Sequence, residues 1–260
     1  MKPGFLLYFL VLFVFFGLNR ARASVFGDML DSKDTRVRAV VCLLIRKVRG
    51  GRAQTQVRKI SVEQRNIRLV AVGDDLLAGV GDPRTLGWFG RVMARTPQHV
   101  AQISAYNLAA PNEGTEQLNA RWFDEARRRF QPGAENRLVI APSTFDIDLG
   151  LTSARSRLNL ANMVDMASQN NIKVLVVGPP PSLDAERNRR IADLSAAYAD
   201  VVTRRNHVYV DTFNPLLHHE QWRNDLATND GRPGQSGYGL MAWLVLHRGW
   251  YSWLNLPEQA

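Results

Sequence analysis

The sequence predicts an α/β fold: a three-layer α/β/α sandwich around a five-stranded parallel sheet. Two observations predict it. Strand-like and helix-like patterns alternate from Arg68 onward, which is the order that β-α-β units produce. The first strand-like run is also continuously apolar, as expected of a parallel strand that is buried on both faces.

The first half of the domain shows two strand–helix pairs. The first strand, Ile67–Gly73, is an unbroken apolar run, and a helix with amphipathic spacing follows at Thr85–Thr96. Thr85 is the candidate N-cap of that helix because its hydroxyl can accept a backbone N–H. The second strand is His99–Asn107, and the second helix, Thr115–Phe130, ends at a Pro-Gly pair.

The second half repeats the alternation three times. The predicted elements are the strands Asn136–Pro142, Ile172–Pro181 and His207–Thr212 and the helices Ser156–Gln169, Arg189–Arg205 and Gly237–Leu254. Five strands joined by helices predict the flavodoxin-like order 2-1-3-4-5, with the first strand in the centre. Ligands of such sheets bind at the carboxyl ends of the strands.

The charge distribution divides the chain into an N-terminal extension, residues 1–65, and a domain, residues 66–255. The extension holds 13 of the 33 Lys and Arg residues and 4 of the 24 Asp and Glu residues, which accounts for the whole net charge of +9. The 20 basic and 20 acidic residues that remain balance one another. Because the domain lacks a basic field that would attract phosphates, we expect no nucleic-acid partner for it.

The extension begins with the apolar segment Phe5–Leu18. Its length suits a signal-peptide core better than a bilayer span, and Ala21–Ala23 resembles a cleavage site. The many basic residues that follow would, however, retain the chain on the cytoplasmic side. Three interpretations stay open: a leader or start-site artefact, a membrane contact of a cytoplasmic protein through Phe5–Leu18, and secretion.

No pattern of a cofactor or metal site is present. Cys42 is the only cysteine, so the chain forms neither an intrachain disulfide nor a cysteine metal site. The alternative is that Asp75 and Asp230 hold a cation together, but two carboxylates are a weak metal signal. We therefore expect neither a metal nor a cofactor.

Four polar blocks lie at the predicted strand ends. They are Gly-Asp-Asp-Leu at residues 73–76, Asn107–Thr115, Ser143–Ile147 and Asn229–Val245. In order and spacing they resemble the blocks of the GDSL (SGNH) hydrolases, a family of lipases and esterases. That family has Gly-Asp-Ser-Leu, Asn-x-x-x-x-Gly, Gly-x-Asn-Asp and Asp-x-x-His-Pro in these places. The resemblance covers about residues 66–255 and implies the SGNH hydrolase fold.

The resemblance also implies that the chemical groups of the family are replaced. Asp75 stands in place of the serine, Asn112 in place of the oxyanion glycine and Phe145 in place of the oxyanion asparagine. No histidine separates Arg232 from Pro233, and only the aspartate of the dyad is kept, as Asp230. The cleft implied by the resemblance is formed by Gly73, Asp74, Asp75, Asn112, Phe145, Asp230 and Arg232.

These replacements predict a catalytically degenerate esterase-like domain. A serine hydroxyl becomes a nucleophile only when a histidine takes its proton, and here both are missing. We expect the cleft to bind a small molecule, such as an acyl- or ester-like ligand, or to serve as an interaction surface. Asp75 would then cap the following helix or contact the ligand. A membrane-tethered scaffold is a third class, if the N-terminal segment is genuine.

The alternative is an active ester hydrolase with a non-standard site. Asp75 would attack the ester or activate water, and His218 or His219 would replace the missing base. Under either interpretation Asp75, Asn112, Phe145 and Asp230 should converge on one cleft, with the two carboxylates within about 10 Å of each other, where they would perturb one another's ionisation.

Overall fold

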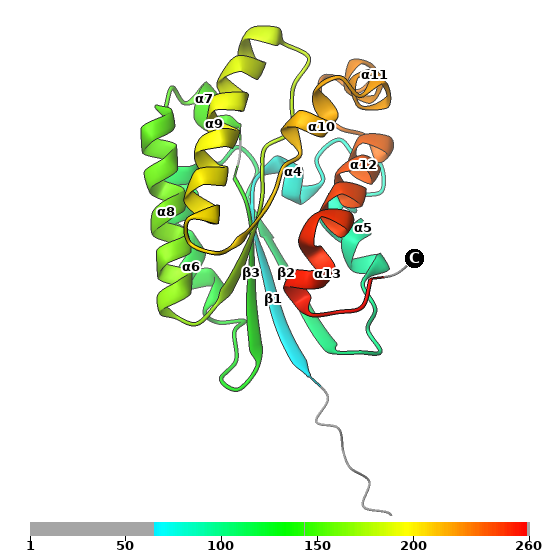
Figure 1. Cartoon of the computed structure of the whole chain (residues 1–260). Helices are drawn as coiled ribbons and strands as arrows, with labels where there is room; N and C mark the ends of the chain where they lie inside the picture. The colour runs from blue at the N-terminus through cyan, green and yellow to red at the C-terminus, as the bar shows by residue number, and fades with distance from the viewer. Residues whose placement is uncertain (1–64, 143, 259–260) are drawn as a thin grey trace, which may run out of the picture. The chain divides into compact units, whose positions relative to one another are not determined.

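A five-stranded parallel sheet forms the centre of the domain (Figure 1). The computed structural model describes residues 65–142 and 144–258. Its strands are β1 (Asn66–Gly73), β2 (Gln102–Ala109), β3 (Glu135–Ala141), β4 (Lys173–Val177) and β5 (Val208–Val210). Their order is β2-β1-β3-β4-β5, and every pairing is parallel. The predicted fold class and strand order are therefore confirmed.

Helices cover both faces of this sheet. The long ones are α5 (Gly87–Arg95), α6 (Thr115–Ala126), α8 (Ser153–Gln169), α9 (Ala185–Thr203), α11 (Glu220–Thr228) and α12 (Gln235–Val245). Shorter ones are α4 (Asp75–Ala78), α7 (Phe145–Asp148), α10 (Phe213–Leu217), the π-helical turn η2 (Leu246–Trp250) and α13 (Tyr251–Leu254). In Figure 1, α6, α8 and α9 lie on one side of the sheet, and α5, α12 and α13 lie on the other.

Two apolar cores explain why the central strand is apolar at every position from Leu69 to Val72. Ile67 and Leu69 of β1 belong to the core that includes Trp88 of α5 and residues of α12 and α13. Val70 and Val72 belong to the opposite core, with residues of α6, α8 and α9. Because successive side chains of a strand point to opposite faces, a strand between two helix layers needs apolar residues at every position.

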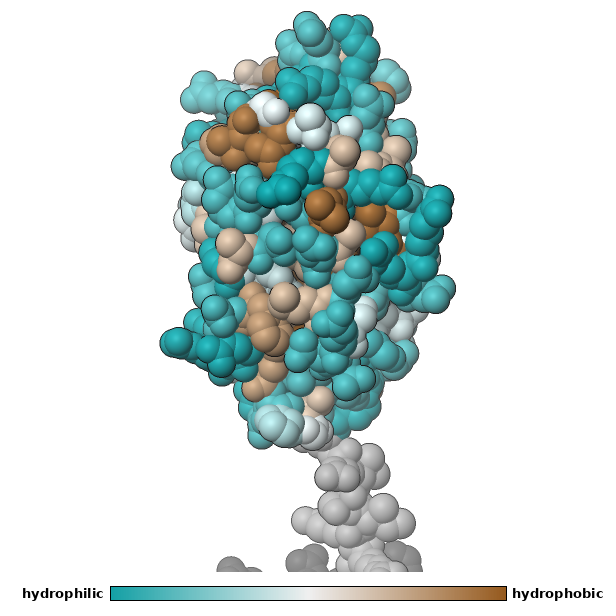
Figure 2. All heavy atoms as spheres, turned by 90° about the vertical axis from the view of Figure 1, so that its left-hand side faces the viewer, coloured by the Kyte–Doolittle hydropathy of each residue, from teal (hydrophilic) through white to brown (hydrophobic). Residues whose placement is uncertain are grey.

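The outer surface of the layer formed by α6, α8 and α9 is mostly hydrophilic. Figure 2 shows this side, with apolar side chains in a few separate spots among polar ones. The large apolar residues exposed on α8 and in the segments beside α7 and α9 are Leu149, Leu158, Met166 and Leu183. Single exposed apolar residues are normal on protein surfaces.

The start of α5 differs from the prediction. Thr85 is not the N-cap: its φ is 52°, and Leu86 occupies the cap position without a side-chain hydrogen bond. The buried Asp82 supplies the missing acceptor, since its carboxylate accepts the N–H groups of Gly87 at 3.0 Å and of Arg84 at 3.1 Å. An acceptor five residues before the helix is invisible to a rule based on the adjacent residue.

The predicted C-terminal helix is interrupted. Arg248 and Gly249 leave the helical conformation between α12 and α13, and the φ of Gly249 is 131°. A Cβ at Gly249 would lie 2.7 Å from Cγ1 of Val208, so glycine lets the chain pass close to β5. Close packing against the sheet therefore breaks a pattern that is helical throughout.

The predictions for the N-terminal extension lie outside the described residues, apart from Arg65. They include the apolar segment Phe5–Leu18 and the segment Ala21–Ala23 that resembles a cleavage site. Within residues 65–142 and 144–258, no helix is both long and apolar enough to cross a membrane.

Candidate functional site

The turn after β1 carries two adjacent aspartates to the carboxyl edge of the sheet. Gly73 ends the strand, and a Cβ there would lie 2.6 Å from the carbonyl oxygen of Ala141 on β3. Asp74 is the N-cap of α4, because its carboxylate accepts the N–H of Leu76 at 3.1 Å. Asp75 is the first residue of the helix. The capping role that we expected of Asp75 therefore belongs to Asp74.

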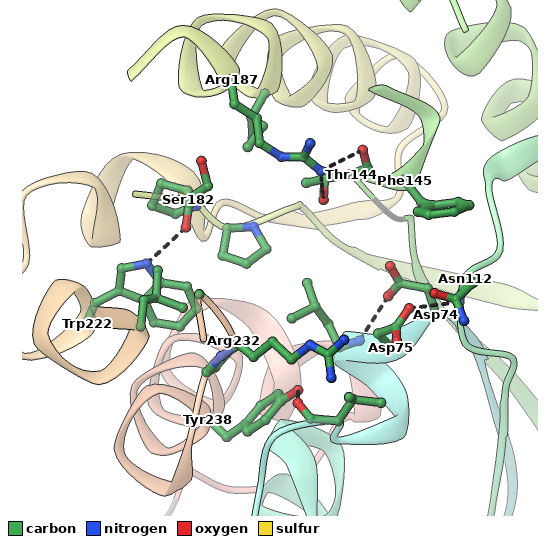
Figure 3. A pocket seen from close by; sticks show the side chains of 18 residues that line it. Asp74, Asp75, Asn112, Thr144, Phe145, Ser182, Arg187, Trp222, Arg232 and Tyr238 are labelled. Carbon is green, nitrogen blue, oxygen red and sulfur yellow. Dashed lines mark hydrogen bonds between the residues drawn. The ribbon is translucent and has the colours of Figure 1, made fainter. Parts of the chain in front are cut away.

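The side chain of Asp75 instead reaches the loop after β2. Its Oδ2 accepts the backbone N–H of Asn112 at 2.8 Å (Figure 3). Asn112 has a φ of 61°, a left-handed conformation that asparagine tolerates better than most residues. In the GDSL pattern this position is the glycine whose N–H stabilises the oxyanion. In this protein the carboxylate of Asp75 already accepts a hydrogen bond from that N–H.

Asn107 holds these two loops together. Its Nδ2 donates to the carbonyl oxygen of Leu77 in α4 at 3.0 Å, and its Oδ1 accepts the N–H of Ala109 at 3.0 Å. One side chain thus links the helix that carries Asp75 to the strand that leads to Asn112. Asn107, the first residue of the second block, therefore has a structural role.

Two residues after β3 stand at the last two positions of the Gly-x-Asn-Asp block. Phe145 replaces the asparagine, and Asp146 keeps the aspartate. Phe145 begins α7 and lines the cleft at the position of the oxyanion asparagine. The next residue, Asp146, is buried and accepts both the N–H and the hydroxyl of Thr115, each at 2.6 Å. Tyr198 also donates to Asp146, and burial, followed by the charge of Asp146, raises the pKa of the tyrosine. Asp146 thus joins the third block to the start of α6.

The closing loop places Arg232, and not Asp230, in the cleft. Asp230 is exposed with a φ of 52°, and it is not among the residues that line the cavity. Arg232 does line it, and its guanidinium points toward Asp75 (Figure 3). Arg232 directly precedes Pro233, which is where the motif Asp-x-x-His-Pro has its histidine. Counted back from the same proline, Asn229 takes the place of the aspartate.

The cavity has a volume of about 320 Å³, at the lower end of the range for small-molecule sites. Of the seven predicted cleft residues, five line it: Asp74, Asp75, Asn112, Phe145 and Arg232. Gly73 and Asp230 do not. Of the four residues expected to converge, Asp75, Asn112 and Phe145 therefore do so, and Asp230 stays outside.

Most polar side chains of the cavity already have partners. Arg187 forms a bidentate ion pair with Asp148 and donates to Thr144, and its hydrogen bond lowers the pKa of Asp148. The indole N–H of Trp222 donates to the carbonyl oxygen of Pro181 at 3.0 Å. The hydroxyl of Tyr238 donates to the carbonyl oxygen of Val80 at 2.7 Å. Burial, followed by the charge of Asp74, raises the pKa of Tyr238.

No histidine is present in the cavity lining. All five histidines of the chain, His99, His207, His218, His219 and His247, fall within the described residues, and none of them lines it. His218 and His219 are exposed, at the junction of α10 and α11. In the part of the chain that the structure describes, no three His, Cys, Asp or Glu residues are grouped to hold a metal ion.

Arg187 is a cavity residue that the sequence interpretation did not single out. It lies in α9, near the N-terminus of the helix that follows β4, and its side chain returns over the strand ends. The rule that ligands bind at the carboxyl ends of parallel strands indicates only the residues that directly follow a strand. A signal was present, because the first turn of a helix after a parallel strand also borders the ligand site.

The same fold occurs in solved esterases. A lipase/acylhydrolase from Enterococcus faecalis is 21% identical with a TM-score of 0.57, over 76% of this chain and 100% of that chain. An esterase from Pseudoalteromonas sp. is 16% identical with a TM-score of 0.57, over 72% and 99%. An acetylxylan esterase from Geobacillus stearothermophilus is 14% identical with a TM-score of 0.59, over 75% and 97%. At these identities the likeness shows the fold alone.

Sequence comparison gives the family directly. A search of the curated proteins finds no significant match. The model of the GDSL-like lipase/acylhydrolase family, however, matches residues 71–240, more than half of the chain, and this range contains the turn after β1 and the closing loop. The chain therefore belongs to the GDSL-like lipase/acylhydrolase family and contains a hydrolase-type domain of that family.

Proposed function

We propose that this domain binds a small molecule in its cleft and does not hydrolyse esters. The observation that carries the proposal is the hydrogen bond between Asp75 and the N–H of Asn112. It puts a carboxylate in place of the nucleophilic hydroxyl, and that carboxylate takes up a donor that an oxyanion would need.

The other replacements support the same conclusion. Phe145 has no hydrogen-bond donor on its side chain, so the third block supplies no side-chain donor to an oxyanion. Arg232 precedes Pro233 where the motif has its histidine, and an arginine does not give up its proton in proteins. Acyl transfer needs nucleophile, base and oxyanion donors together, because they act as a unit.

No observation favours the alternative of an active esterase. That mechanism needs a base in contact with Asp75 or its water, and His218 and His219 lie outside the cavity lining. The cavity itself favours binding, since it combines apolar side chains with several polar groups.

Turnover of short p-nitrophenyl esters tests the proposal. Wild type should release p-nitrophenol no faster than Asp75→Ala or the heat-denatured protein. Turnover clearly above buffer that is lost in Asp75→Ala would establish an enzyme and refute the proposal. The double variant His218→Ala/His219→Ala is the matched test of a substitute base, and it should behave as wild type.

A further inference from the structure

The polar groups of the cavity that have no protein partner define what a ligand must offer. Among the described residues, the guanidinium of Arg232 forms neither a hydrogen bond nor an ion pair, and the side-chain amide of Asn112 makes no hydrogen bond. The Oδ2 atom of Asp75 accepts the N–H of Asn112, so its Oδ1 atom remains to accept a hydrogen bond from a ligand. By contrast, Arg187, Thr144, Ser182, Trp222 and Tyr238 all have partners.

These three groups face the same space. Asp75, Asn112 and Arg232 all line the cavity, and the Arg232 side chain extends across it toward Asp75 (Figure 3). The two opposite charges nevertheless form no ion pair with each other. A ligand in the cavity therefore meets both a cation and an anion.

The balance of charge indicates a zwitterion. Asp75 stands against the guanidinium of Arg232, because the charge of Arg187 is matched by Asp148. A carboxylic acid alone would pair with Arg232 but would also meet the carboxylate of Asp75, and an amine alone would leave Arg232 without a partner. A molecule with both an ammonium and a carboxylate satisfies each side, through the charge-assisted hydrogen bonds that are strongest in proteins.

The cavity wall also has an apolar part. Trp222 lies across the cavity from Asn112 (Figure 3), and its indole N–H is used by Pro181, so the ring offers only apolar surface. Pro180, Ile191 and Leu226 extend this surface. A cavity of about 320 Å³ is large enough for one amino acid with its side chain.

We propose that the cleft recognises a free α-amino acid with an apolar side chain, its carboxylate on Arg232 and its ammonium on Asp75. This proposal rests on the proposed ligand-binding function and narrows it to one class of ligand. The ammonium bonds to Oδ1 of Asp75 while Oδ2 stays on Asn112, and the apolar side chain packs on Trp222 and the prolines.

Calorimetric titration of the full-length protein with four probes tests the assignment. L-phenylalanine and L-leucine should bind. 3-Phenylpropionate, which lacks the ammonium, and phenethylamine, which lacks the carboxylate, should each bind at least about tenfold more weakly than L-phenylalanine. Equal binding of 3-phenylpropionate or phenethylamine would overturn the proposal, as would the absence of binding by both amino acids at millimolar concentration.

Two variants assign the two charges. Arg232→Gln should weaken L-phenylalanine at least about tenfold and leave phenethylamine unchanged. Asp75→Asn should weaken L-phenylalanine and phenethylamine but not 3-phenylpropionate. Arg128→Gln, which removes an exposed arginine in the turn after α6, is the matched control and should change nothing. Because Arg232 is exposed and its guanidinium forms no hydrogen bond or ion pair with the described residues, its variant should fold as wild type does. A loss that is the same for all probes would contradict the assignment.

The two proposals fail separately. Hydrolysis of p-nitrophenyl esters by the same preparation would refute the non-hydrolytic function whatever the amino acids do. Tight binding of 3-phenylpropionate without hydrolysis would refute the amino-acid assignment and leave ligand binding intact.

Discussion

The carboxylate of Asp75 accepts the backbone N–H of Asn112 at 2.8 Å, so the residue at the serine position of the GDSL pattern binds the N–H at the position of the pattern's oxyanion glycine. Substituting this carboxylate frees that donor but supplies no base. If the domain is non-hydrolytic, as proposed, a change at Asp75 must therefore be combined with a new base before ester hydrolysis can occur.

Asp75→Ser alone should show no ester turnover above buffer. The new hydroxyl has no histidine to take its proton, and triad members contribute little singly. Adding Arg232→His and Asn229→Asp rebuilds the motif before Pro233, and this triple variant should exceed every single variant. Adding Phe145→Asn should raise kcat further, by up to about 10²–10³-fold for one oxyanion donor.

Initial rates with p-nitrophenyl butyrate measure this series. The control is the same set with alanine at position 75, which keeps the histidine and lacks the hydroxyl. Substantial turnover by Asp75→Ser alone would reveal a base in the cleft that the structure does not identify.

Asp146→Asn should lower the free energy of unfolding by about 2–4 kcal/mol. Asp146 is buried and accepts two hydrogen bonds from Thr115, and an amide there has only one acceptor atom. Urea denaturation followed by circular dichroism measures the loss. Asp124→Asn, at an exposed residue with one surface ion pair, should change it by less than about 0.5 kcal/mol. Equal effects of the two variants would contradict the role of Asp146.

The contribution of Asp82 to stability should disappear in acid. A hydrogen bond from Arg91, together with those from Arg84 and Gly87, holds the pKa of Asp82 below its ordinary value. A lowered pKa in the folded state means that the contribution is complete above the unfolded value of about 3.9 and is lost as the pH falls through the folded pKa.

Asp82→Asn should therefore be less stable than wild type by about 1–3 kcal/mol at pH 7. The difference should stay constant down to about pH 4 and then shrink as the pH falls further. Urea denaturation at a series of pH values checks this. A difference that persists unchanged into strong acid would show that Asp82 acts by shape and not by charge.

Gly73→Ala should destabilise the domain by about 2 kcal/mol or more, because the new Cβ would lie 2.6 Å from the backbone oxygen of Ala141. Backbone on both sides of the contact leaves little room to relax. Gly239→Ala is the matched control, since Gly239 lies within α12 and a Cβ there meets nothing within 4 Å. That variant should be neutral or up to about 1 kcal/mol more stable. Thermal unfolding of both variants decides between the two outcomes.

The sequence by itself determined the sheet and its order, because these follow from local pattern. The apolar runs at Ile67–Gly73 and Ile172–Pro181 mark strands that are buried on both faces, and alternation with helices fixes the parallel connections. It also brought Asp75, Asn112 and Phe145 to one cleft, since parallel strands end at the same edge.

The tertiary structure decided which side chains face that cleft. Asp230 and Arg232 are two residues apart, yet the positive φ values of Asp230 and Gly231 turn the loop so that only Arg232 lines the cavity. Asp82 caps a helix five residues away, and Arg187 reaches the cleft from the first turn of α9. Such contacts depend on backbone turns and on elements that are distant in sequence, so no local pattern contains them.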